Sequence, residues 1–298
     1  MAQKVRTEAQ KVVLSLVLLA FVFACMGVFA RYLGHGFTIF QQVYLRIFVA
    51  LICSLFIFRH RLDLTKLKKA TQKEWLVLVA RGVLLYGIAV PMLSQAVIDT
   101  KLGNVSFLNT LPFIAIFGFI FFKEKVTTTK ILLILLAMVG VGLITIRDPH
   151  HLSHLGKGEV LAIISGAMFS LSYVARKWHT KLFNNQEITV LVFVFGVSSA
   201  FLFSLLHKDG MPRHWTWGLV GVVVVAGLAN VINLFLTNYG FERVKNVLAG
   251  NVLTLEVFFA IVIGYLLYGE TLGPRELLGG LLIVASVVMM NKYTAIEQ

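Results

Sequence analysis

Long apolar stretches follow one another along the whole chain, separated by short polar breaks that often contain Gly or Pro. Each stretch has about the 20 residues that a helix needs to cross a bilayer. Backbone groups cannot stay unpaired in lipid, and no period-two alternation marks a β-barrel, so we expect membrane helices. The ten predicted spans are 12–32, 38–58, 75–97, 103–122, 130–146, 158–177, 188–206, 217–241, 247–267 and 275–290.

The composition agrees with a polytopic membrane protein. Of the 298 residues, 58% are apolar and only 14% are charged, against about 25% in soluble domains. This argues against a soluble enzyme, a disulfide scaffold and a disordered chain, and favours one membrane domain over residues 1–298. The net charge of +13 is expected for basic cytoplasmic loops in contact with membrane lipids, so we predict no nucleic-acid partner.

No cofactor or metal is predicted. Cys25 and Cys53 lie in apolar runs and show no metal or redox spacing. The cluster of His150, His151 and His154 has no acidic or Cys ligand nearby, so we interpret it as part of a solvated loop. The chain also lacks a phosphate-loop motif, so it carries no ATPase domain of that kind.

The basic residues predict the orientation. With the N-terminus placed in the cytoplasm, eighteen of the 27 Lys and Arg residues fall on that side, seven fall on the other, and two lie within spans. Lys and Arg concentrate in cytoplasmic loops. We therefore expect an all-α, multi-pass protein of the bacterial inner membrane, with both termini cytoplasmic.

An internal repeat divides the chain into two halves, 12–146 and 158–290. A shift of 146 residues places Gly118 on Gly264 and Glu124 on Glu270. Each half has five predicted spans, an odd number, so the second half enters the membrane from the opposite side. Two inverted five-helix repeats are typical of secondary transporters, in which a shared central site opens alternately to each side.

Three further segments carry a family resemblance together with this repeat. They are Arg46-Ile-Phe-Val-Ala, at the entry to the second span, and two helix ends. The helix ends are Leu111-Pro112-Phe113 through Lys123-Glu124, and Leu255-Glu256-Val257-Phe258 through Gly269-Glu270. With them the chain resembles the drug/metabolite transporter superfamily, in particular its ten-helix EamA-type members. The resemblance implies export of small metabolites, often amino acids or related compounds. Val257 stands where family members often have proline, which leaves open whether the helix breaks at Glu256.

Three charged residues fall deep inside predicted spans, where a charge costs about 2.5–3.5 kcal/mol on insertion scales. Glu256 is a candidate for proton coupling or amine binding, or it forms a structural ion pair with Arg81 or Arg46. Arg81 is a candidate for binding a substrate carboxylate or phosphate, or it extends towards the cytoplasm. Arg46, nearer the outer end, is a candidate for substrate contact or for a structural or gating role.

Uncharged polar residues complete the candidate substrate site. Asn230 and Asn233 share one face of the eighth span, and the 146-residue shift aligns Asn233 with Gly87 of the third span, the residue after Tyr86. The other candidates are Asn109, Asn251 and Tyr173. Each of these amides alternatively joins helices by hydrogen bonds, and the tyrosines alternatively anchor at an interface. Pro91 and Pro112 are candidate helix breaks.

The leading hypothesis is a secondary transporter that exports a small polar metabolite, with proton coupling as an open question. An acid, two arginines and several amides suit a zwitterion, while anionic or nucleoside-like substrates stay open. The alternatives are a flippase of the same fold for a lipid or lipid-linked sugar, and an integral-membrane enzyme. The sparse acidic residues and the inverted repeat give the enzyme no support, so we predict a non-enzyme.

Overall fold

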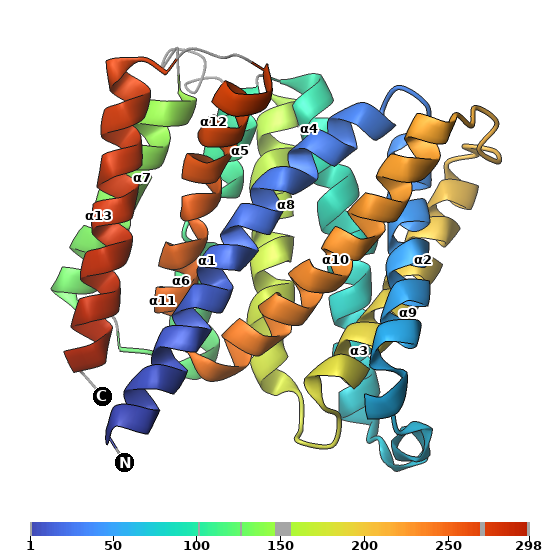
Figure 1. The fold of residues 1–298 in the computed structure, drawn as a ribbon, viewed down its shortest axis with the longest axis horizontal. Coiled ribbons are helices and arrows are strands. Elements are labelled where there is room, and N and C mark those ends of the chain that lie inside the picture. Colours follow the sequence, from blue (N-terminus) through green and yellow to red (C-terminus); the bar gives the residue numbers. More distant parts are fainter. Residues whose placement is uncertain (1, 101, 126, 147–155, 269–271, 297–298) are drawn as a thin grey trace.

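The computed structural model describes residues 2–100, 102–125, 127–146, 156–268 and 272–296 as a helical bundle (Figure 1). Ten helical segments in this part of the chain are long and apolar enough to cross a membrane, which confirms the ten predicted helices. The helices of the first half are α1 (Ala2–Leu33), α2 (Ile39–Phe58), α3 (Gln72–Gly82), η3 (Val83–Ala89), α4 (Val90–Asp99), α5 (Leu102–Asn109), α6 (Phe113–Phe122) and α7 (Thr128–Thr145). Short 3₁₀ helices η1 (Arg59–Arg61) and η2 (Leu64–Lys69) connect α2 to α3.

The second half repeats this pattern. Its helices are α8 (Lys157–Val174), η5 (Ala175–Trp178), α9 (Asn185–Leu206), α10 (Trp217–Arg243), α11 (Asn246–Leu253), α12 (Leu255–Tyr268) and α13 (Pro274–Ile296). The sequence around His150 and His154 and the residue Glu270 lie outside the described residues.

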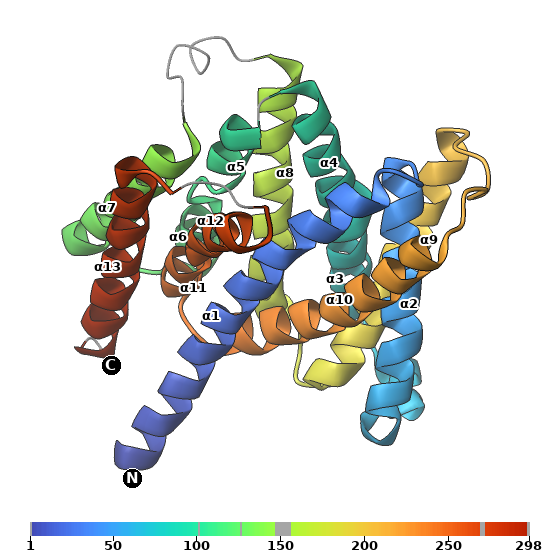
Figure 2. The same ribbon diagram turned by 45° about the horizontal axis from the view of Figure 1, so that its top comes forward.

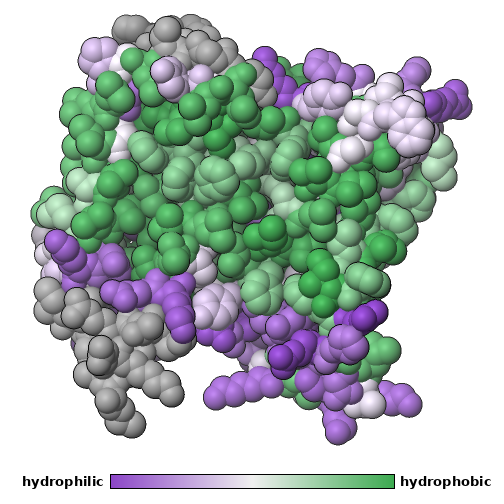
Figure 3. Space-filling model, viewed as in Figure 1, coloured by the Kyte–Doolittle hydropathy of each residue, from purple (hydrophilic) through white to green (hydrophobic). Residues whose placement is uncertain are grey.

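Both ends of the chain lie on one face of the bundle, here called the terminal face (Figures 1 and 2). An apolar belt crosses the middle of the face seen in Figure 3, and hydrophilic residues gather above and below it. Large apolar side chains such as Phe56 and Leu266 are about 70% exposed on this belt. In water such an exposed area would be unfavourable, so the belt is the surface that contacts lipid.

The two halves interlock, and their contacts obey the inverted repeat. The first span, α1, packs along α10 of the eighth span, and the third span, through α4, packs along α8 of the sixth. A shift of five spans converts the first pair into the second. The pairs α2 with α9 and α7 with α13 map onto themselves. Gly140 and Gly279 bring α7 and α13 together, because a Cβ atom on either would lie 2.6 Å from the other's carbonyl oxygen.

The fourth and ninth spans, which are repeat partners, are both discontinuous. In the fourth, α5 ends at Asn109 and α6 begins after Pro112, as Pro112 suggested. In the ninth, a turn at Thr254 separates α11 from α12, and the Thr254 hydroxyl donates to the carbonyl of Asn251 at 2.7 Å. The ninth span therefore breaks two residues before Glu256, without a proline. Interrupted helices at matching places in two repeats are the usual position of a transporter's binding site.

Candidate functional site

The third span widens into a π-helix, η3, over Val83–Ala89, and Tyr86 lies in this segment. Pro91, one turn further on, has no N–H to donate to the carbonyl of Gly87. The backbone shifts to the wider pattern instead, and the N–H of Val90 donates to the carbonyl of Leu85. Single π-helical turns of this kind occur often at functional sites.

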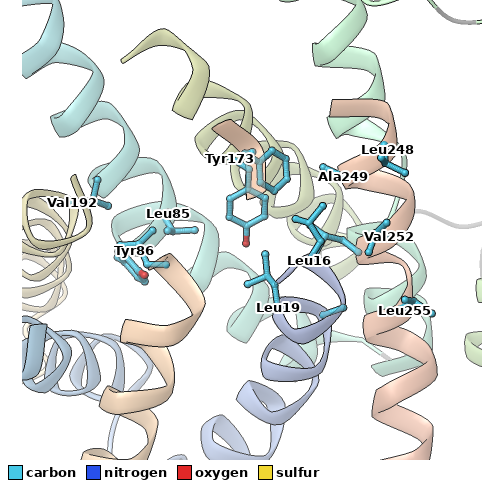
Figure 4. Packing of buried hydrophobic residues seen from close by; sticks show 14 of the residues in the cluster. Leu16, Leu19, Leu85, Tyr86, Tyr173, Val192, Leu248, Ala249, Val252 and Leu255 are labelled. Atoms are coloured by element: carbon cyan, nitrogen blue, oxygen red, sulfur yellow. The ribbon is translucent and has the colours of Figure 1, made fainter. Parts of the chain in front are cut away.

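The Tyr86 ring packs on α9 at a place that only glycine allows. A Cβ atom added to Gly196 would lie 2.5 Å from Cδ2 of Tyr86. Tyr173 of α8 stacks with aromatic rings from three helices, among them Phe23 at 5.8 Å and Phe241 at 5.4 Å between ring centroids. Figure 4 shows both tyrosines in the interior of the bundle, with the hydroxyl group of Tyr173 pointing towards Leu19 of α1 and the Tyr86 ring lying farther away, beside Leu85.

Arg81 is fully buried, and each nitrogen of its guanidinium group has a partner within the protein. Nε donates to the carbonyl of Ser172 at 2.9 Å, and Nη2 donates to Oδ1 of Asn238 at 2.6 Å. Nη1 lies 3.2 Å from Nε2 of His179. Because Arg81 can only donate, Nε2 of His179 must accept, so the proton of the neutral imidazole is on Nδ1.

The same imidazole connects Arg81 to a buried carboxylate. Nδ1 of His179 donates to Oε1 of Glu74 at 2.6 Å, and the backbone N–H of Thr180 donates to Oε2 at 2.9 Å. Burial and, secondly, the positive charge of Arg81 lower the pKa of His179 from 6.5 to about 3. Glu74, His179 and Arg81 therefore form a compensated network with a neutral histidine in the middle.

Arg46 has a very different environment. Its side chain is only 5% exposed, and its Nε has no hydrogen-bond partner. Among the described residues no hydrogen bond or ion pair reaches its guanidinium group. Its positive charge acts on the Tyr86 hydroxyl, as does that of Arg81. A buried cation without a partner is expensive, because its desolvation is not repaid.

Glu256 is the matching acidic group. It lies in the first turn of α12, directly after the break at Thr254, where the helix dipole favours a negative charge. Its residue is partly exposed, and among the described residues no hydrogen bond or ion pair holds its carboxylate, with Arg46, Arg81 or any other group. Its charge acts on the Tyr173 hydroxyl. Arg46 and Arg81 thus both act on Tyr86, and Arg81 and Glu256 both act on Tyr173.

The candidate asparagines fall into two places. Asn230 and Asn233 lie on α10 beside the α2–α10 contact, where Gly227 approaches the carbonyl of Arg46. Asn230 donates to the carbonyl of Ala226 at 2.7 Å, whereas the Asn233 amide makes no hydrogen bond within the described residues. Asn230 thus lies three positions, and Asn233 six positions, along α10 from the contact with the Arg46 backbone.

The other two asparagines lie between helices. Asn251 on α11 faces α13, where its Oδ1 is 3.2 Å from the Ser286 hydroxyl. Asn109 ends α5, and its carbonyl packs against Gly166 of α8. Each keeps one buried side-chain atom without a partner, Oδ1 of Asn109 and Nδ2 of Asn251.

Glu124 has a role that the sequence did not predict, although the repeat singled it out. Its Oε1 accepts from Nζ of Lys177 and from both the backbone N–H and Nδ2 of Asn246, each at 2.9 Å. Its Oε2 accepts from the backbone N–H of Val247 at 3.2 Å. Glu124 therefore caps α11, whose own N-cap residue, Lys245, offers no side-chain cap. We call this contact the Glu124 latch, because it joins the two halves at the terminal face.

Comparison with known proteins agrees with this architecture. The model of the EamA-like transporter family matches residues 10–146 and again 156–292, once on each five-helix half. A solved crystal structure has the same fold over 94% of this chain and 95% of its own, with a TM-score of 0.75 and 16% sequence identity.

Relatives in other organisms are also similar to this chain. An uncharacterized transporter of Archaeoglobus fulgidus is 29% identical over 167 residues, which are 56% of this chain and 58% of the relative. The uncharacterized transporter sll1164 of Synechocystis is 24% identical over 263 residues, which are 82% of this chain and 74% of the relative. The match to the Archaeoglobus protein thus spans less than two thirds of that protein's length.

Proposed function

The chain belongs to the EamA-like transporter family, and from this premise we propose that it is a secondary transporter that exports small polar metabolites, such as amino acids or related compounds, by alternating access. The observation that carries the substrate class is Arg46. It is buried at the interior of the bundle and has no partner in the described protein, whereas every nitrogen of Arg81 has one. A carboxylate on the substrate would supply what Arg46 lacks.

The surroundings of Arg46 suit a zwitterion. A guanidinium group binds a carboxylate through two parallel hydrogen bonds. Glu256, which also has no partner among the described residues, can accept from the substrate ammonium group. The hydroxyl groups of Tyr86 and Tyr173 lie among these charges and can donate to the substrate or accept from it. In this proposal Arg81 positions the third span instead of binding the substrate.

The interrupted spans are the parts of this design that can move. The fourth and ninth spans break near their middle, and the Glu124 latch joins the end of one to the start of the other. When the latch holds, the terminal face is closed between α6 and α11. Its release would separate these helix ends and open the site to that face, which we expect to be cytoplasmic because its loops are basic.

In this proposal Glu256 is the residue that binds the coupled proton. A carboxylate that binds either a proton or the substrate ammonium group exchanges one for the other, which couples their movements in opposite directions. The partly exposed position of Glu256 supports this role, because exchange requires access. A carboxylate held by several hydrogen bonds, like Glu74, would not exchange.

Counterflow into proteoliposomes tests the proposal. The panel compares amino acids with amines that lack the carboxylate and with acids that lack the ammonium group. We expect the wild type to move zwitterions faster than either analogue, and Arg46→Met to lose the preference for zwitterions over amines. The proposal is wrong if no member of the panel moves, or if amines and zwitterions move equally well in the wild type.

A further inference from the structure

An apolar groove opens on the outer surface of the bundle, away from the candidate substrate site. It has a volume of about 280 Å³. Every residue that lines it is apolar: Leu76, Val77, Ala80, Leu84, Phe121, Leu171, Ala175 and Trp178. Nothing in this lining can hydrogen-bond a polar headgroup except the indole N–H of Trp178.

Helix α8 forms the floor of this groove. It packs against both α6 and α3, while α3 and α6 form no extended contact with each other. The outer edges are exposed, with Leu76 at 69% and Phe121 at 45%. Both residues belong to spans, so the groove faces lipid in the half of the membrane next to the terminal face.

Two lysines stand at the end of the groove that meets the terminal face. Lys73 lies on the same stripe of α3 as Val77 and Ala80, one turn closer to the terminal face than Val77. Lys123 follows the last residue of α6 and is exposed, as Lys73 is. Neither lysine forms an ion pair with another described residue. The nearby Lys177, by contrast, is bound to Glu124 at 2.9 Å.

We propose that this groove holds one acyl chain of an anionic phospholipid, whose phosphate group binds to Lys73 and Lys123. The chain itself gives no selectivity, because the surrounding lipid tails are as apolar as the groove. Selectivity comes from the headgroup, since each basic residue near the membrane surface attracts an anionic lipid about fivefold, the equivalent of about 1 kcal/mol. Trp178 adds an amphipathic ring at the level of the headgroups.

The bound lipid would contact parts of the protein that we expect to move during transport. The groove lies between α3 and α6 of the first half and α8 of the second, so a bound chain contacts both halves. Trp178 also packs on Phe121 and Phe122 at the end of α6, at 5.1 and 6.3 Å between ring centroids. The next residues along the chain lead to Glu124. The lipid therefore sits beside the Glu124 latch.

Quenching of Trp178 by brominated lipid tests the site. Trp75, Trp215 and Trp217 are replaced by Phe, and the protein is placed in nanodiscs of phosphatidylcholine that contain increasing fractions of dibrominated phosphatidylglycerol or dibrominated phosphatidylcholine. We expect the anionic lipid to associate about 25-fold more strongly than the zwitterionic lipid, about fivefold for each of the two lysines, as judged by quenching of Trp178.

Two sets of variants complete the test. In the Lys73→Gln/Lys123→Gln double variant the ratio should fall close to one, while the matched Lys68→Gln/Lys69→Gln variant should keep it. Ala80→Phe fills the groove and should reduce quenching by both lipids. Equal association of the two lipids with the sole-Trp178 protein, or an unchanged ratio in Lys73→Gln/Lys123→Gln, would overturn the proposal. Lipid scrambling between leaflets that Ala80→Phe abolishes would also overturn it, because the groove would then be a path for lipid and not a fixed site.

Discussion

Arg46 and Arg81 should respond in opposite ways to the same substitution. Both are buried cations inside spans, and Met replaces either with an unbranched apolar side chain. In Arg81→Met three hydrogen bonds disappear, and Glu74 keeps a buried negative charge without its compensating cation. Breaking a buried charge network by removing one partner costs about 3–5 kcal/mol. Arg46→Met breaks no such bond and removes an unpaired charge, so stability should stay equal or rise.

Thermal unfolding of the purified proteins in detergent measures this difference. About 2 °C per kcal/mol is a reasonable conversion for a large domain, so Arg81→Met should lower Tm by roughly 6–10 °C. Arg46→Met should have a Tm at or above that of the wild type. Transport should show the reverse order, because the lost bonds between Arg46 and a substrate carboxylate are worth about 1.5–3 kcal/mol, or roughly ten- to a hundredfold in apparent affinity.

Two results would refute this reasoning. If Arg46→Met unfolds as easily as Arg81→Met, Arg46 has a structural partner that stabilises the fold. If Arg46→Met keeps the wild-type affinity for zwitterions, the substrate carboxylate binds elsewhere. The Arg46→Lys variant serves as a control, because it keeps the charge and loses the planar, two-pronged donor. We expect it to bind substrate more weakly than the wild type and more strongly than Arg46→Met.

Three further variants test the remaining parts of the design. Glu256→Gln should keep substrate binding by thermal shift but lose pH-driven flux in proteoliposomes; retained coupling would exclude Glu256 as the proton carrier. Glu124→Gln weakens the cap of α11, which is worth about 1 kcal/mol, and its charge-assisted bonds, so spin labels placed on either side of the latch should report a larger open population. An unchanged distance distribution would show that the latch does not hold the terminal face closed. Because the pKa of His179 is lowered to about 3 in the folded state, only the unfolded state binds this proton between pH 6.5 and 3. The free energy of unfolding should therefore be unaffected by this group above pH 6.5 and should decline as the pH falls through this window. His179→Asn should flatten the corresponding decline in Tm.

The spans were predictable because each depends on local composition alone. The bounds of every predicted span agree within a few residues with those of a membrane-length helical segment in the structure, including the long eighth span, predicted at 217–241 and found as Trp217–Arg243. The break after Pro112 was predictable for the same reason, since proline acts on its own helix. The break at Thr254 has no proline, and it depends on a side chain that bonds its own backbone and on packing in the most buried span, so the sequence left it open.

The difference between Arg46 and Arg81 could not be predicted, although both residues were recognised as unusual. Depth in a span follows from counting residues, and by depth the two arginines are similar. What separates them are partners that lie far along the chain, since Ser172, His179 and Asn238 are 91, 98 and 157 residues from Arg81. The inverted repeat does not predict these partners of Arg81, because they are not at equivalent positions of the two halves. Only the fold shows which cation is already neutralised, and for this reason we propose Arg46, and not Arg81, as the residue that contacts the substrate. The same logic explains Glu124: the repeat marked its position, but its bonds to Asn246 and Val247 cross between the halves, so its function as a cap became visible only with α11 in place.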